Sequence, residues 1–282
     1  MNINWYPGHM KKTRESILKN LPLVDIVFEL IDARIPYSSR NPIIDEILGE
    51  KPRIIVLNKS DLASESGNKI WEEYFNRINK ATALIDALNS KGIEQLMKLS
   101  LKLTEQKREA YERRGVINRP IRAMILGIPN VGKSTLINSL SKRKGTKTGN
   151  KPGVTRSNQW IRTKDGLELL DTPGILWPKF EDKDVGLNLA FTGAIKDEIL
   201  DTETLALKLV ERISASFPNN LKDRYGIEIE GKTSLKIMED IGISRGCLIK
   251  GGNIDYTKTS NIILDEFRKG QIGKITLEFP RE

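Results

Sequence analysis

The clearest chemical signature in the sequence is a phosphate-binding pattern near the middle of the chain. Residues 127–134 read Gly-Ile-Pro-Asn-Val-Gly-Lys-Ser, the spacing G-x-x-x-x-G-K-[ST]. The glycines allow backbone N–H groups to converge on phosphate oxygens, and a following helix adds a positive dipole end. Lys133 is expected to bridge the β- and γ-phosphates, and Ser134 to ligate magnesium. A glycine-rich loop that binds nothing is the alternative, but a strand at 124–126 and a helix at 133–140 supply the required context. The pattern predicts a nucleoside-triphosphate site.

A second polar pattern, Asn58-Lys59-Ser60-Asp61, follows an apolar strand. The carboxylate of Asp61 can accept from both N1–H and N2–H of guanine, whereas adenine would leave it unpaired, and buried polar mismatches discriminate strongly. Asn58 would contact the base edge, and the stem of Lys59 would cover the base face. Asp86-Ala87 follows the next strand, where a backbone N–H could serve guanine O6. Taken alone, the pattern at residues 58–61 is more typical of a plain turn after a strand.

Elements that could position these residues alternate along the first two thirds of the chain. Strands are predicted at 24–31, 53–57, 82–85, 124–126, 159–162 and 167–171, and helices at 11–20, 42–48, 69–77, 93–103 and 133–140. This alternation implies a mostly parallel sheet with helices on both faces. The charged segment 104–118 is predicted as a helix end or linker.

The character of the sequence changes after Trp177. Helices are predicted at 202–216, 221–225, 234–241 and 256–269, and residues 275–279 as an edge strand or an extended arm. The sequence therefore predicts an α/β domain over 1–177 and a small, mainly α-helical domain over 178–282.

Composition narrows the class of protein. With 38% hydrophobic and 29% charged residues, the chain has the profile of a soluble globular protein. A single cysteine, Cys247, excludes an internal disulfide and fits a reducing compartment. No apolar run reaches the length of a membrane span, and the amino terminus has no signal-peptide layout. We expect a cytoplasmic protein without a membrane partner.

The net charge of +9 is unevenly distributed. Residues 1–177 hold 30 Lys+Arg and 19 Asp+Glu, whereas residues 178–282 hold 16 and 18. Residues 142–164 contain eight basic residues and no acidic one. Such an excess suits a polyanionic partner, with RNA as the first candidate, and ordinary solubility charge is the alternative.

Taken together, the motifs resemble the guanine-nucleotide set of Ras-like P-loop GTPases in rotated order, because the base-reading pair precedes the phosphate loop. The chain is therefore similar to circularly permuted GTPases, in which the loops still meet at the carboxyl ends of the strands. The resemblance implies GTP contacts from Asn58, Lys59, Ser60, Asp61, Asp86, Ala87, Asn130, Val131, Gly132, Lys133, Ser134, Thr135, Thr155 and Gly174. Asp86 stands where many such proteins have Ser, which weakens its side-chain assignment but not the backbone contact from Ala87.

Within that class the chain resembles the ribosome biogenesis GTPase A family over nearly its whole length. The resemblance is carried by Trp5-Tyr-Pro-Gly-His-Met10, Asp32-Ala-Arg-Ile-Pro36, the phosphate loop, Lys151-Pro-Gly-Val-Thr155 and the helical carboxyl-terminal part. It implies a GTP-hydrolysing factor that acts late in assembly of the large ribosomal subunit and binds its precursor and rRNA. The alternatives are a GTPase of tRNA or other RNA maturation and a small-molecule kinase, which Asn58-Lys-x-Asp61 disfavours. We expect a monomer that does not bind DNA.

The same resemblance suggests how hydrolysis would proceed. Magnesium would be held by Ser134 and Thr155, with Asp171 behind a coordinated water. Ile175 occupies the place of the water-orienting Gln, so intrinsic hydrolysis should be slow. Two residues are candidates to help: His9, whose alternative role is purely structural, and Asn130, which could hold a potassium ion beside the phosphates.

Overall fold

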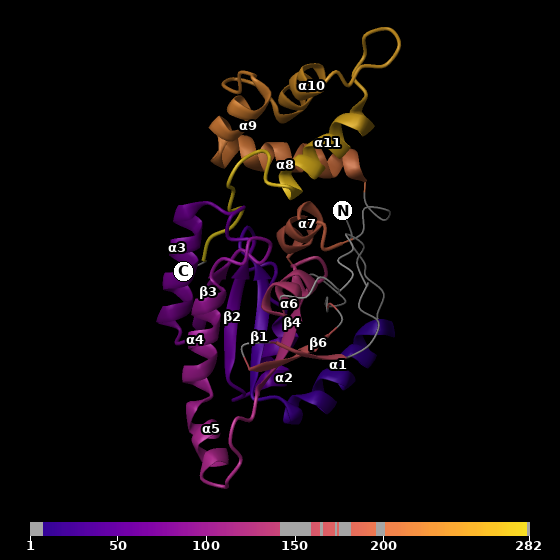
Figure 1. Ribbon diagram of the computed structural model, residues 1–282. Helices are drawn as coiled ribbons and strands as arrows, with labels where there is room; N and C mark the ends of the chain where they lie inside the picture. Colours follow the sequence, from indigo (N-terminus) through magenta and orange to yellow (C-terminus); the bar gives the residue numbers. More distant parts are fainter. Residues whose placement is uncertain are drawn as a thin grey trace.

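The computed structural model describes residues 8–141, 159–163, 166–172, 174, 182–195 and 201–280. Within these residues a six-stranded sheet carries helices on both faces, and a cluster of helices sits beyond one end of the sheet (Figure 1). The α/β fold with a mainly parallel sheet and a helical carboxyl-terminal part is therefore confirmed. None of the helices in the described residues is long and apolar enough to cross a bilayer.

The sheet has the order β3-β2-β1-β4-β6-β5, and only β5 runs antiparallel to its neighbour. Its strands are β1 (Ile26–Asp32), β2 (Arg53–Asn58), β3 (Ala81–Ile85), β4 (Ile121–Gly127), β5 (Gln159–Arg162) and β6 (Leu167–Asp171). The central strands are rich in β-branched and aliphatic residues and are buried along their length, as expected for parallel strands covered on both faces. The base-reading motif follows β2 and the phosphate loop follows β4, which pairs with β1 at the centre of the sheet, so the order of the motifs is rotated as predicted.

Helices cover the two faces of the sheet in different sets. They are α1 (Gly8–Asn20), α2 (Pro42–Leu48), α3 (Glu65–Arg77), α4 (Ile93–Leu103), α5 (Glu105–Glu112) and α6 (Lys133–Ser141), with a 3-10 turn η1 (Leu21–Leu23) after α1. Ile17, Ile44 and Trp71 bring α1, α2 and α3 onto one face. Leu96 and Leu136 bring α4 and α6 onto the other. Alternate residues of β1 supply both cores, because side chains on a strand alternate between faces.

The carboxyl-terminal part contains α7 (Lys183–Phe191), α8 (Thr202–Ser216), α9 (Pro218–Tyr225), α10 (Ser234–Ser244) and α11 (Tyr256–Arg268). The sequence did not predict α7. Val185 and Leu189 of this short helix pack into the same core as α4 and α6 on the sheet. Ala190 and Phe191 pack into the core of the helical cluster. Packing on both sides leaves α7 without the single apolar stripe that marks an amphipathic helix.

Several boundaries differ from the prediction. α3 begins at Glu65 rather than Lys69 because the side chain of Ser64 accepts a hydrogen bond from Gly67 N and caps the helix. α1 begins at Gly8 rather than Lys11, and segment 104–118 contains the separate helix α5.

Residues 274–279 form an extended arm rather than a strand of the sheet. In Figure 1 this yellow segment descends from the helical cluster and lies beside α3. Its backbone is held by hydrogen bonds from Ile275 N to Leu62 O and from Leu277 N to Arg34 O. The carboxyl end of the chain therefore contacts the loops that follow β1 and β2.

Candidate functional site

The predicted site loops meet at one edge of the sheet. The register pairs Asp32 with Asn58, Asn58 with Ile85, and Leu30 with Gly127. On the far side of β4, Ile125 pairs with Asp171. The carboxyl ends of all five parallel strands thus lie at the same edge of the sheet, which brings together base-reading and phosphate-loop residues that are 71 and 73 positions apart in the sequence.

Asn58 joins three of these loops. Its Nδ2 donates to the carbonyl of Val131 at 2.8 Å, and its Oδ1 accepts from the backbone N of Ala87 at 3.2 Å. A Cβ on Gly132 would lie 2.3 Å from Asn58 Nδ2, so only glycine allows this approach. The Ala87 N–H already has an acceptor here, and its contact with guanine O6 stays a prediction.

Lys59 extends between the base-reading loop and the phosphate loop. Its backbone has φ +60°, and its Nζ donates to the carbonyl of Asn130 at 2.8 Å and to Oδ2 of Asp32 at 2.9 Å. Burial lowers the pKa of Lys59, and the neighbouring carboxylate of Asp32 opposes that shift. Burial by itself would raise the pKa of Asp32, but Arg34 and Lys59 together hold that pKa well below its usual range. Asp32 is therefore ionised, and its hydrogen bond with Lys59 helps to fix that side chain against the phosphate loop.

Asp61 and Asp86 lie near each other at this edge and differ in their surroundings. Both oxygens of Asp86 accept hydrogen bonds from Asn89, one from its backbone and one from its side chain, which closes the turn after β3. The side chain of Asp86 is thus used within its own turn. The pKa of Asp61 is raised by burial and by repulsion from Asp86. A carboxylate with a raised pKa gains from a ligand that brings N–H donors.

The phosphate loop is shaped by its own backbone. Gly127 and Gly132 have φ +158° and +101°, and Asn130 lies in the left-handed region at +58°. The buried Nζ of Lys133 donates to the carbonyls of Gly127 and Ile128 at 3.1 and 2.8 Å. A Cβ on Gly174 would stand 3.0 Å from Lys133 Nζ and 2.8 Å from Pro129 N, so the backbone at Gly174 closes on the loop. The loop and Gly174 therefore enclose a space that a side chain at position 174 would fill.

Other predicted residues are only partly placed. Ser134 and Thr135 lie in the first turn of α6, beside the loop. Asn130 directs its Nδ2 to the carbonyl of Gly193 at 2.7 Å, just after α7. The backbones of His9 and Asp171 are in α1 and β6, but their side chains, like Thr155 and Ile175 as a whole, lie outside the described residues.

The donor chemistry fits magnesium held mainly by phosphate and one or two protein oxygens. Among the described residues no group of three or more His, Cys, Asp and Glu side chains could cage a metal. Mg²⁺ in nucleotide sites is bound in this sparse manner, and the hydroxyl of Ser134 is an oxygen ligand of the appropriate type.

Sequence reasoning quoted Asp32 and Arg34 but gave them no role. Both are buried, at 1% exposure each, and Arg34 clasps Asp32 through Nε and Nη2 at 2.9 and 2.8 Å. The available signal was an acidic residue at the end of a strand, followed two residues later by a basic one.

Comparisons with known proteins agree with this geometry. Residues 122–229 match a family described as "50S ribosome-binding GTPase". The chain is 47% identical to ribosome biogenesis GTPase A of Bacillus licheniformis, over all of both chains. The chain is a member of the ribosome biogenesis GTPase A family. Members of this family hydrolyse GTP and act in ribosome biogenesis, and the present chain is accordingly a GTPase with GTP as its substrate.

More distant relatives of this ribosome biogenesis GTPase A family member show the same organisation. Mitochondrial ribosome-associated GTPase 1 of Ictalurus punctatus is 31% identical over 98% of this chain and 92% of its own. The crystal structure of GNP-bound YlqF from T. maritima is 26% identical, covers 96% of this chain and 99% of its own, and superimposes with a TM-score of 0.64. The match therefore spans both the α/β part and the helical part.

Proposed function

We propose that this GTPase acts late in assembly of the large ribosomal subunit and binds the precursor particle and its rRNA in a nucleotide-dependent way. The single observation that carries the proposal is the meeting of Asn58, Lys59 and the phosphate loop at one sheet edge, in a chain that matches relatives named for ribosome biogenesis over its full length. The description of the matched family as 50S-binding supports the choice of the large subunit. We place the protein in the cytoplasm as a monomer, where ribosomal precursors are its partners.

We assign the base-reading roles to Asp61 for N1–H and N2–H, Asn58 for the base edge and Lys59 for the base face. Lys133 would exchange its two carbonyl acceptors for the β- and γ-phosphates when a nucleotide enters, because a charged acceptor makes the stronger hydrogen bond. The N–H groups of Gly132, Ser134 and Thr135 would surround the phosphates at the start of α6.

Magnesium would be held by Ser134 and Thr155, with Asp171 behind a water, and it neutralises charge on the phosphates when bound. The N–H of Gly174 would donate to the γ-phosphate. Because Ile175 cannot hydrogen-bond to the attacking water, we expect slow hydrolysis that the ribosomal particle stimulates.

Two groups are proposed to compensate for Ile175. His9 would orient the water or neutralise charge from the start of α1. The carboxamide oxygen of Asn130 would ligate potassium, while its nitrogen keeps the contact with Gly193. Turnover that is equal in potassium and in sodium buffers would remove the ion from this account.

We further propose that the basic segment 142–164 selects the GTP-bound form on RNA. A phosphate-contacting surface of this kind is sensitive to charge reversal and to salt. Unchanged particle binding after Lys142, Arg143 and Lys144 are all replaced by Glu would contradict this role.

The decisive experiment is cosedimentation with purified large-subunit precursors, mature subunits and the small subunit. We expect binding to large-subunit precursors with a non-hydrolysable GTP analogue and weaker binding with GDP. Equal binding in both nucleotide states, or binding to tRNA precursors in place of subunits, would contradict the proposal and favour a role in other RNA maturation.

A further inference from the structure

A buried ion pair behind the base-reading motif reaches into the helical part of the molecule. Arg34 clasps Asp32, and the Oδ2 of Asp32 also accepts from Lys59. The remaining nitrogen of Arg34, Nη1, donates to the carbonyls of Phe267 and Arg268 at 3.2 and 3.4 Å. These carbonyls end α11, where the helix dipole favours a cation. The guanidinium also stands 5.1 Å from the centroid of the Phe267 ring.

A second connection leaves the same end of α11. Arg268 donates from Nε to the carbonyl of Phe191 at 3.0 Å and from Nη2 to the carbonyl of Ala190 at 2.9 Å. These two carbonyls end α7. Two residues further on, the carbonyl of Gly193 accepts from Asn130, and the carbonyl of Asn130 accepts from Lys59.

These contacts close into a ring, which we call the α11 ring. It passes from Lys59 through Asp32 and Arg34 to the end of α11, and from there through Arg268, the end of α7 and Asn130 back to Lys59. Asp32 and Arg34 are almost fully excluded from solvent, so water cannot replace a lost member. The phosphate loop and the base-reading motif thus share one hydrogen-bonded circuit with the ends of two helices of the helical part.

We propose that Arg34 is a positioning residue for nucleotide binding. Arg34 fixes the position of Asp32, which in turn fixes Lys59, and the carboxyl-terminal end of α11 fixes Arg34 itself. The proposal rests on the nucleotide roles proposed above for Lys59 and Asn130. By linkage, any force that shifts α11 weakens nucleotide binding, and bound nucleotide holds α11 more firmly by the same factor. A particle that engages the helical part can therefore adjust nucleotide affinity without contacting the nucleotide.

Conservative variants at two points of the ring test this coupling. Arg34→Lys keeps the charge, but a lysine cannot donate to Asp32 and to both α11 carbonyls together. Arg268→Lys cannot make the two hydrogen bonds, from Nε and Nη2, to the carbonyls at the end of α7. Arg245→Lys is the matched control, because Arg245 lies in the helical part and bonds Glu266 of α11 outside the ring. Affinity for a fluorescent GDP analogue is measured on the full-length chain at fixed magnesium, alongside GDP-free thermal unfolding.

We expect each ring variant to bind GDP roughly 5- to 30-fold more weakly, within the usual range of coupling between sites, and the control to stay within about twofold. The fold-loss of GDP affinity in the double variant Arg34→Lys/Arg268→Lys should be smaller than the product of the two single fold-losses. Either single variant already interrupts the ring, so the second substitution has less left to remove. A purely structural ion pair would lower the unfolding temperature without this non-additivity in GDP affinity.

The outcomes separate the inference from the proposed function. Folded ring variants that bind GDP as the wild type does would overturn the inference, as would additive losses. If Arg34→Lys fails to fold, Arg268→Lys alone decides, and GDP affinity equal to that of the control counts against the ring. A wild-type chain that binds ADP as tightly as GDP would instead contradict the proposed function.

Discussion

The two lysines of the candidate site, Lys59 and Lys133, are held by different parts of the chain. Lys133 bonds two carbonyls of its own loop, five and six residues away. Lys59 bonds Asn130 and Asp32, which lie 71 and 27 residues away, and Asp32 is in turn fixed by Arg34 and the end of α11. The phosphate end of the site is a local structure, whereas the base end depends on tertiary contacts.

This difference separates the phosphate contacts of Lys133 from base recognition. The contacts of Lys133 lie within its own loop, so they depend less on the rest of the molecule than those of Lys59, although Asn130 joins the same loop to the α11 ring. The helical part contacts the base end of the site at several points. One of them is the hydrogen bond from Ile275 N to the carbonyl of Leu62, directly after Asp61. Substitutions far from the nucleotide should therefore change base recognition more than phosphate binding.

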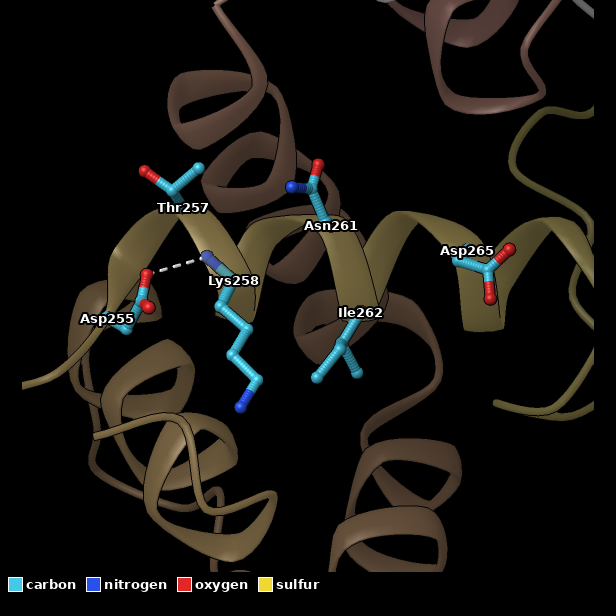
Figure 2. Close-up of a pocket in the computed structure, with 6 residues that line it drawn as sticks. All are labelled: Asp255, Thr257, Lys258, Asn261, Ile262 and Asp265. Atoms are coloured by element: carbon cyan, nitrogen blue, oxygen red, sulfur yellow. Dashed lines mark hydrogen bonds between the residues drawn. The ribbon is translucent and has the colours of Figure 1, made fainter. Parts of the chain in front are cut away.

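The helical part also carries a shallow hollow beside α11. It is lined by the N-cap residue Asp255 and by Thr257, Lys258, Asn261, Ile262 and Asp265 of that helix (Figure 2). In this close-up, Asp255 caps the helix by accepting from the backbone N of Lys258. The carboxyl-terminal end of the same helix belongs to the α11 ring. A partner that binds this face is therefore one way to shift that end of α11.

The largest effect is expected from Lys133→Ala, at the local end. Two hydrogen bonds to charged phosphates, at about 1.5–3 kcal/mol each, would be lost, which corresponds to roughly 10²- to 10⁴-fold weaker GTP binding. Titration calorimetry with GTP measures it, and Lys69→Ala on the exposed face of α3 is the control. A loss below tenfold would mean that the loop does not hold the phosphates.

The second prediction concerns base recognition by Asp61. Asp61→Asn replaces one acceptor by a donor and should lower guanine affinity by about 10²-fold, since each unsatisfied buried group costs about 1–3 kcal/mol. Xanthine carries a carbonyl at C2, so the variant should bind XDP better than GDP. Unaltered preference for GDP would show that another group reads the base. The phosphate contacts should be unaffected, because XDP offers the same phosphates.

The local end of the site was predictable from sequence, and the base end only in part. The phosphate loop and α6 follow from glycine spacing and a helical apolar pattern, so residues 127–140 were enough. Asn58 was expected at the base edge, but its contact with Val131 was not predicted, because nothing local in residues 58–61 specifies that contact. The role of Arg34 was missed, because its partners on α11 lie more than 230 residues away. The helix α7 was missed for the same kind of reason, because two partners bury its two faces.

The pKa of Asp61 gives a smaller, pH-dependent effect. Burial and Asp86 raise that pKa above 3.8 in the nucleotide-free chain, and guanine requires the ionised form. GDP affinity should therefore be constant near neutral pH and fall as the pH is lowered through the raised pKa, by up to about tenfold per pH unit. A series of GDP titrations from neutral to mildly acidic pH measures it. The Asp61→Asn variant lacks this proton, so a fall of equal size in that variant would assign the effect to another group.

The smallest effect on the nucleotide is expected from the carboxyl-terminal arm. The carboxylate of Glu278 accepts from Ser38 N and Oγ at 2.6 Å each and from Asn188 Nδ2 at 2.8 Å, so it anchors the arm that holds Leu62. Glu278→Ala should lower the free energy of unfolding by about 1–3 kcal/mol, because it leaves buried donors unpaired. GDP affinity should fall by only about two- to threefold, since the loop that carries Asp61 and the α11 ring both keep their own contacts. Chemical denaturation and GDP titration measure the two quantities. Lys274→Ala is the matched control on the same arm, because its ion pair with Glu65 is exposed and contributes little to stability. A Glu278→Ala chain that loses stability and also loses GDP binding tenfold would show that the arm, as well as the α11 ring, supports base recognition.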